Sequence, residues 1–238
     1  AVCSSGLGVM ADAGEGRGEV ERRVSLHYAM VPAQPWESLE RAWLPLLPEA
    51  KRDAVQRLRA AADRNASLLG IALLESALAA LGHSFDPGAL DYPARGKPRL
   101  TDGPDFSISH AAGLVACAVA AAGRIGLDLE LAGSVGESTA RRVLGPEERE
   151  RLARGELAAT DAWVMKEAVA KLAGRGIGEL RAVTLHTDRA SFDGGEFWIR
   201  RVALARSHVA WLAHDRDGGR VTPSLRGAEE FAPLPAAP

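Results

Sequence analysis

The first regular pattern in the chain is an alternation of apolar and polar residues over residues 24–30, VSLHYAM. Its apolar side chains recur at every second position, which places them on one face of an extended strand. From residue 48 to residue 81 the apolar spacing becomes three and four, which predicts helices with a break near Asp63. Gly82 follows the last periodic position and is well suited to end the second helix. The next segment, residues 86–104, is rich in proline and glycine and is predicted to be a loop.

The rest of the chain repeats this order of elements. Strands are predicted at 106–109, 114–120 and 125–130, helices at 146–154 and 161–173, and strands again at 183–186, 197–204 and 208–214. Strand, helices and strands therefore occur twice, which predicts an α+β fold of two similar halves related by a pseudo-two-fold axis. We expect a flexible tail over 1–23, an N-terminal half over 24–122, a C-terminal half over 123–216 and an irregular tail over 217–238.

Composition narrows the class of protein. The chain has 238 residues, 47% of them hydrophobic, and a formal net charge of −2. Such a composition is typical of a globular protein and argues against nucleic acid as a partner. No segment has the roughly 20 apolar residues that a membrane-spanning helix needs. Cys3 and Cys117 are too few for a disulfide framework or a metal cluster, so we expect a reducing, cytoplasmic setting.

The first candidate for chemistry is GLDLE, residues 126–130, at the end of a predicted strand. Asp128 and Glu130 are two positions apart and therefore project from the same face. Two adjacent carboxylates repel each other unless a cation lies between them, and oxygen ligands suit a hard ion such as Mg²⁺. The alternative is a solvated strand end with two ordinary acids.

The second candidate is the helical segment WVMKEAVAKLAGRG, residues 163–176. It contains Lys166, Glu167 and Lys171, and the last two are neighbours on the helix surface because they are four residues apart. The alternative is a routine surface ion pair, worth only about 0.2–0.5 kcal/mol.

The third candidate is FSISHA, residues 106–111, where Ser109 and His110 could both donate hydrogen bonds to a phosphate. The alternative is an ordinary loop histidine. A serine hydrolase is disfavoured because adjacent strand residues point to opposite faces and nothing marks Ser109 as a nucleophile elbow. Lys97 precedes Pro98 in a stiff loop, where the alternative is a plain surface charge.

Lysine is rare in this chain, which has only four lysines among its 29 basic residues. Three of them, Lys97, Lys166 and Lys171, lie in or beside these candidate segments, and the fourth is Lys51. Lysine is a compact point charge whose pKa shifts readily, unlike that of arginine. This bias indicates places where a phosphate or a transferred proton is handled.

The set formed by GKP (96–98), FSISHA, GLDLE and WVMKEAVAKLAGRG resembles the Sfp-type 4′-phosphopantetheinyl transferases of the W/KEA subgroup. The resemblance covers residues 24–214. It implies the 4′-phosphopantetheinyl transferase fold and an Mg²⁺-dependent enzyme, with Mn²⁺ as an alternative ion. The implied reaction moves the 4′-phosphopantetheine group of coenzyme A to a serine of an apo acyl or peptidyl carrier protein and releases 3′,5′-ADP. We expect a cytoplasmic monomer that serves fatty-acid, polyketide or nonribosomal-peptide synthesis.

The resemblance assigns roles at the reacting end of coenzyme A. Asp128, Glu130 and Glu167 correspond to the metal ligands that hold the pyrophosphate, and Glu167 also to the base for the incoming serine. Lys171 corresponds to the cation that stabilises or protonates the leaving phosphate. Lys166 belongs to the same motif and is expected to add positive potential.

Other residues are assigned to the nucleotide end. Ser109, His110 and Lys51 correspond to contacts with the 3′-phosphate. Lys97 lies where the family binds the nucleotide, and Ser67 corresponds to a hydroxyl nearby.

Two positions depart from the family pattern. Ala54 replaces a second basic residue, for which Arg52 or Arg57 could compensate. Ser107 replaces the asparagine that often begins the serine–histidine motif. These changes concern affinity for coenzyme A and not the chemistry.

Two other functions remain open from the residues themselves. One is an Mg²⁺-dependent phosphohydrolase or nucleotidyl transferase that uses the same carboxylates. The other is a non-catalytic module that binds carrier proteins. The second is disfavoured because Asp128, Glu130, Glu167 and Lys171 are all present.

Overall fold

The computed structural model describes residues 23–94, 96–217 and 221–232, and it confirms the predicted α+β class. The expected tail over 1–23 falls outside these ranges, apart from its last residue. None of the helices within them is both long and apolar enough to cross a membrane.

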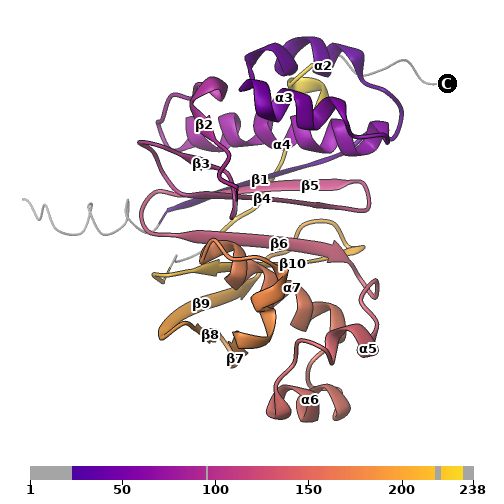
Figure 1. Cartoon of the computed structure of the whole chain (residues 1–238), viewed down its shortest axis with the longest axis vertical. Helices are drawn as coiled ribbons and strands as arrows, with labels where there is room; N and C mark the ends of the chain where they lie inside the picture. Colours follow the sequence, from indigo (N-terminus) through magenta and orange to yellow (C-terminus); the bar gives the residue numbers. More distant parts are fainter. Residues whose placement is uncertain (1–22, 95, 218–220, 233–238) are drawn as a thin grey trace, which may run out of the picture.

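The first half places one long helix over a sheet (Figure 1). Its main elements are β1 (Val24–Met30), α2 (Glu37–Trp43), α3 (Glu49–Gln56), α4 (Ala61–Ala80), β4 (Phe106–Ala111) and β5 (Leu114–Ala120). The predicted loop also contains a small ribbon of β2 (Leu90–Asp91) and β3 (Arg99–Leu100), and two 3-10 turns are η1 (Leu44–Leu46) and η2 (Pro87–Ala89). The break predicted near Asp63 lies slightly earlier, so Asp63 falls in the first turn of α4. A carboxylate is favourable there because it faces the positive end of the helix dipole.

The second half has the same plan. Its elements are β6 (Ile125–Leu131), α5 (Glu137–Ala140), α6 (Pro146–Ala153), α7 (Ala159–Leu172), η3 (Ile177–Ala182), β7 (Thr184–Leu185), β8 (Arg189–Phe192), β9 (Gly195–Arg201) and β10 (His208–His214). The sheet order is β6-β10-β9-β8-β7, and each neighbouring pair is antiparallel.

The two halves share one strand order. In the first, β1 pairs with β5 and β5 with β4; in the second, β6 pairs with β10 and β10 with β9. In each, the long helix between the first two of these strands, α4 or α7, packs on the sheet. The predicted repetition of element order is therefore present in the structure.

The two sheets pack face to face through a core shared by both halves. Ala116, Ala118 and Ala120 alternate along β5 and contribute to this core together with Leu127 and Leu129 of β6. The opposite face of β5 carries larger residues and packs beneath α4. Small side chains at every second position let the halves approach closely. The result is a layered arrangement with α4 and α7 on the outer sides.

The expectation of an irregular tail over 217–238 differs from the structure in its described part. There β11 (Ser224–Leu225) runs parallel to β1, and η4 (Ala228–Glu230) follows it. Ala232 is buried in the core of the first half, and the indole N–H of Trp43 donates to the Phe231 carbonyl over 3.4 Å. A strand of two residues is too short to produce a visible alternation, which is why the sequence pattern does not reveal it.

Candidate active site

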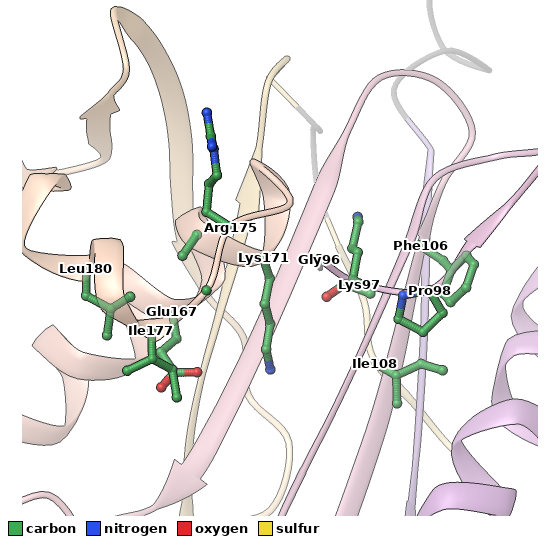
Figure 2. A pocket seen from close by; sticks show the side chains of 13 residues that line it. Gly96, Lys97, Pro98, Phe106, Ile108, Glu167, Lys171, Arg175, Ile177 and Leu180 are labelled. Carbon is green, nitrogen blue, oxygen red and sulfur yellow. The ribbon is translucent and has the colours of Figure 1, made fainter. Parts of the chain in front are cut away.

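A cleft of about 340 Å³ opens between the two halves. Figure 2 shows Glu167 and Ile177 on one side, Pro98 and Ile108 on the other, and Lys171 between them. The volume is within the usual range for a small-molecule site. A larger hollow of about 690 Å³ lies within the second half, but it is lined by none of the residues predicted from the sequence. The cleft between the halves is therefore the candidate active site.

Gly126 determines how closely α7 approaches β6. A Cβ atom at this position would lie 1.9 Å from the carbonyl oxygen of Ala168 and 2.6 Å from the amide nitrogen of Leu172, both backbone atoms of α7. Only glycine permits this contact. Because Ala168 and Leu172 directly follow Glu167 and Lys171, the close approach brings both functional side chains beside the end of β6.

Ser109, Asp128 and Lys171 form a hydrogen-bonded cluster, of which Lys171 lines the cleft. Lys171 Nζ donates to Asp128 Oδ1 over 2.6 Å and to Ser109 Oγ over 3.0 Å. The Ser109 hydroxyl donates to the same Asp128 oxygen over 2.8 Å. Asp128 is only 4% exposed, so this is a largely desolvated ion pair with charge-assisted hydrogen bonds. The structure thus joins three of the predicted residues from three different elements.

Two serines connect the halves along the open edge of β6, and we call Ser107 and Ser109 the serine seam. The Ser107 hydroxyl donates to the Leu127 carbonyl over 3.4 Å, and the Leu129 amide donates to Ser109 Oγ over 3.3 Å. Hydroxyls of β4 therefore meet backbone groups of β6 that do not pair within its own sheet. This contact fixes Ser109 opposite Asp128.

Glu167 has the chemistry of a base that works near neutral pH. Burial raises its pKa to about 7, and the negative charges of Asp128 and Glu130 act in the same direction. Lys171 and a hydrogen bond with the Trp163 side chain oppose the increase. A carboxyl group with this pKa can both accept and release a proton at neutral pH.

The predicted metal ligands have the chemistry of a hard-cation site. Asp128, Glu130 and Glu167 offer carboxylate oxygens, and their mutual repulsion is evident in the raised pKa of Glu167. However, no group of three acidic, histidine or cysteine side chains among the described residues is arranged to hold a metal ion. Instead, the ammonium group of Lys171 neutralises Asp128. The ammonium group of Lys171 is thus the cation described beside Asp128, and the three-carboxylate metal site stays a prediction.

A second polar cluster lies on the α3–α4 side of the first half. Lys51 Nζ donates to Ser67 Oγ over 2.8 Å and lies 5.4 Å from the centre of the Tyr92 ring. Burial lowers the pKa of Lys51. The pKa of His110 is also lowered, first by burial and then by the positive charges of Lys171 and Lys51. Lys51 and Ser67, both expected at the nucleotide end, are therefore in direct contact, and His110 lies within the electrostatic influence of Lys51.

Ser109 and His110 have different surroundings. In the β4–β5 register, Ser109 pairs with Ala116 of the core between the sheets, whereas His110 pairs with Val115 of the core beneath α4. The two side chains therefore leave opposite faces of β4. Ser109 belongs to the Asp128 cluster, and the expected contacts of Ser109 and His110 with the 3′-phosphate stay a prediction.

Lys97 reaches the cleft wall but its ammonium group is already bonded. Its Nζ atom donates to Asp105 Oδ2 over 2.6 Å and to the Ile125 carbonyl over 2.5 Å. Asp105 in turn accepts from the Ile125 amide over 2.8 Å. The described position of Lys97 thus attaches the 96–98 loop to the start of β6 and does not present a free cation.

Lys166 lies away from the cleft, which corrects the expectation that it adds positive potential there. Its side chain is completely buried within the second half and pairs with Glu148 at 2.9 Å. It also donates to the Val183 carbonyl. A buried group with these partners does not contact a ligand in the cleft.

The departures at Ala54 and Ser107 have different consequences. Arg52 donates to the Leu47 carbonyl over 3.2 Å, and Arg57 is exposed. These observations do not identify either arginine as a replacement for a basic residue at position 54. Ser107, by contrast, takes part in the serine seam, so its small hydroxyl has a structural use.

Several cleft residues escaped the sequence analysis. Pro98, Phe106, Ile108, Ile177 and Leu180 provide apolar walls. Pro98, Phe106 and Ile108 lie within the quoted motifs, but an apolar side chain gives no sign of whether it lines a cleft or the core, and only the fold shows this.

The C-terminal end of α7 was predicted closely, at residue 173 against Leu172 in the structure. The Arg175 amide donates to the Ala170 carbonyl over 2.8 Å, and Gly174 has a φ of +69°, which ends the helix in a left-handed turn. The carbonyl of Gly174 approaches Gly96 so closely that a Cβ on Gly96 would lie 3.1 Å away. The glycines of GKP and AGRG thus meet at the rim of the cleft, which the AGRG pattern could have indicated.

The protein has two similar α+β halves with a cleft between them. Glu167, with a raised pKa, lines this cleft, and Lys171 at the same site pairs with Asp128. These groups suit proton transfer and charge neutralisation at a phosphate. Residues 124–221 match the family model described as the 4′-phosphopantetheinyl transferase superfamily, so the second half of the fold resembles this superfamily in sequence. No curated protein is detectably similar in sequence to the chain. The match supports phosphopantetheinyl transfer as the general activity, with coenzyme A and carrier proteins as the general partners of that superfamily.

Proposed function

We propose that this protein is an Sfp-type enzyme that transfers 4′-phosphopantetheine from coenzyme A to a serine of an apo acyl or peptidyl carrier protein. The observation that supports this most directly is that Glu167, with a pKa raised to about 7, lines the cleft together with Lys171, which pairs with Asp128. The family match over 124–221 includes all three residues. The protein would act in the cytoplasm as a monomer and serve fatty-acid, polyketide or nonribosomal-peptide carriers.

The nucleotide end of coenzyme A would bind on the side of Lys51, Ser67 and His110. The contact between Lys51 and Ser67 and the positive potential at His110 support this placement. From there the pyrophosphate would extend along the edge of β4 toward Lys171, between the apolar walls of Pro98 and Ile177. In this proposal Lys97 acts by holding the loop, and Ser109 by holding Asp128 and Lys171.

The reaction would be an in-line displacement at the phosphorus that carries the pantetheine arm. The carrier serine hydroxyl would lose its proton to Glu167, and its oxygen would form the new P–O bond. The bond from this phosphorus to the 3′,5′-ADP oxygen would break, and Lys171 would stabilise or protonate the departing oxygen. A base with a pKa of about 7 is well matched to the first step.

Mg²⁺ or Mn²⁺ belongs to the proposal, with Asp128, Glu130 and Glu167 as the residues that would hold it. When bound, the ion would neutralise charge on the pyrophosphate. The ammonium group of Lys171 now bonds to Asp128, so binding of a cation at Asp128 would require Lys171 to turn away. Such a movement would direct Lys171 toward the substrate phosphate.

The test is incubation of the protein with coenzyme A, Mg²⁺ and a panel of apo-carrier domains, followed by intact-mass analysis. We expect one carrier serine to gain the phosphopantetheine mass with stoichiometric release of 3′,5′-ADP. A carrier with its acceptor serine replaced by alanine is the control. Hydrolysis of coenzyme A without carrier would instead indicate a phosphohydrolase, and no reaction with any carrier would contradict the proposal.

A further inference from the structure

Lys166 is a conspicuous residue because it lies inside the catalytic motif but outside the cleft. It is 0% exposed, and its ion-pair partner Glu148 is 3% exposed. Burial of a lysine is costly unless its charge is neutralised and hydrogen-bonded. Lys166 lies directly beside Glu167 in the sequence, so what this buried pair connects bears on the position of Glu167.

The Glu148 carboxylate joins three elements. Its Oε1 atom accepts from the Leu185 amide of β7 over 2.7 Å. Its Oε2 atom accepts from the Gly145 amide at the start of α6 over 2.7 Å and from Lys166 of α7 at 2.9 Å. One buried carboxylate therefore fixes the relative positions of α6, α7 and β7.

Lys166 adds a fourth connection. It donates to the carbonyl of Val183, the residue that follows η3. The other end of η3 begins at Ile177, and both Ile177 and Leu180 line the cleft. Lys166 therefore connects the helix that carries Glu167 and Lys171 to the segment that forms the adjoining cleft wall.

We infer that Lys166 and Glu148 are a positioning pair, which fixes α7 and the η3 wall relative to each other and thereby sets the geometry of the cleft without touching coenzyme A. The inference concerns the cleft of the proposed transferase and rests on that function only for its kinetic readout. It predicts that the two residues act as a unit, although they lie far apart in the sequence.

The test is a double-mutant cycle of Lys166→Met, Glu148→Gln and both together. Each single variant should lower the melting temperature. Each should also accelerate amide exchange at Leu185, Glu179 and Val183 by at least tenfold under conditions where the protein stays folded. The double variant should be no worse than the more damaged single variant. Arg154→Met, which breaks an exposed ion pair directly after α6, should leave all these values unchanged.

Kinetics distinguish positioning from ligand contact. For the positioning pair, Lys166→Met should lower kcat at least tenfold while the KM for coenzyme A changes less than twofold. A KM increase above tenfold, with unchanged melting temperature and unchanged exchange at Leu185, would overturn the inference in favour of a ligand contact. The inference would also be overturned if the losses in kcat and the increases in exchange rate of the two single variants multiplied in the double variant, since the two residues would then act independently. If the wild-type protein transfers nothing, the proposed function fails, while the exchange cycle still decides whether the pair fixes the cleft wall.

Discussion

At the scale of single residues, the site depends on a small number of charged groups that lie close together in a largely desolvated space. Asp128, Glu130 and Glu167 bring three acids together, and Lys171 is the cation bonded to Asp128. Removing any one of them changes the protonation or the position of the others. The predictions at this scale therefore concern proton binding and charge as much as contact.

Glu167 should make the stability of the protein depend on pH. Its pKa is about 7 in the folded protein and near 4.5 when unfolded, so the folded state binds the extra proton between these values. Unfolding then releases a proton, and the free energy of unfolding falls as the pH rises from about 4.5 to 7. Glu167→Gln cannot titrate and does not show this pH-dependent loss. The free energy of unfolding of the variant minus that of wild type should therefore increase by at most about 3 kcal/mol between pH 4.5 and 8. Urea denaturation at both pH values measures the difference, and a difference independent of pH would contradict the assignment.

Lys171→Ala should affect turnover more than binding. The ammonium group neutralises Asp128 and would meet charge that develops on the leaving oxygen, so its removal should lower kcat about 100-fold with a smaller change in the KM for coenzyme A. Transfer to a carrier domain followed by intact mass gives both constants. Arg175→Ala, which removes an exposed side chain at the cleft rim, is the matched control. A selective increase in KM would assign Lys171 to substrate binding instead.

Lys51→Ala should affect the KM for coenzyme A more than kcat, the reverse of Lys171→Ala. Lys51 lies with Ser67 and Tyr92, away from the acids, so its loss should raise the KM for coenzyme A about tenfold and change kcat less. Arg41→Ala, which removes an exposed charge paired with Glu37, is the control. An unchanged KM would place the nucleotide elsewhere.

At the scale of elements, the site exists because α7 lies directly on β6. Gly126 has no side chain where the α7 backbone crosses, and this contact sets the distance from the strand to Glu167 and Lys171. Helix and strand are each ordinary, but their separation is unusually small. Geometry between elements, and not the elements alone, therefore creates the chemistry.

Gly126→Ala should separate α7 from β6. The added Cβ would lie 1.9 Å from a backbone oxygen that cannot rotate away, so we expect a loss of at least about 2 kcal/mol in the free energy of unfolding. Transfer activity should also fall by more than the loss of folded protein explains, because Glu167 and Lys171 move with the helix. Gly136→Ala is the matched control, since no atom lies within 4 Å of its added Cβ. Chemical denaturation and kinetics of both variants check this, and wild-type behaviour of Gly126→Ala would disprove the close contact.

The elements also show where sequence reasoning succeeds and where it fails. Alternation in β1, the apolar run of β5 and the motif residues of β6 and α7 were sufficient to predict these strands, the α+β class and the acid beside Lys171. Lys166 was misplaced because membership in a motif was taken as membership in a site. Residues five apart on a helix are rotated by about 140°, so Lys166 and Lys171 cannot share a narrow face. Glu148 was missed because a buried acid within the sequence PEERERLA looks like any surface charge.

At the scale of the whole molecule, the chain returns to its beginning. After β10 completes the second half, β11 pairs with β1, and Phe231 and Ala232 pack on the first half. No periodicity marks this return, since it depends on contacts between residues about 190 positions apart, such as the 188 between Trp43 and Phe231. The first half is therefore completed by residues that follow the second.

Removal of residues 218–238 should destabilise the first half in particular. It deletes the β11 pairing and the buried Ala232, so we expect a loss of about 2–4 kcal/mol and a lower melting temperature. Amide exchange should accelerate in β1 more than in β10. Removal of residues 233–238 alone keeps these contacts and serves as the control. Equal melting temperatures for the long truncation and the full chain would show that the returning segment contributes no stability.

The serine seam has a consequence for how the protein behaves in a crowded solution. An open strand edge is a template onto which another chain can add, and β6 is the edge strand of its sheet. The hydroxyls of Ser107 and Ser109 meet two backbone groups on that edge, so β4 covers the place where a foreign strand would pair. Strand addition would first have to separate the two halves. The contact that holds Asp128 beside Lys171 thus also covers an edge that would otherwise be open to strand addition.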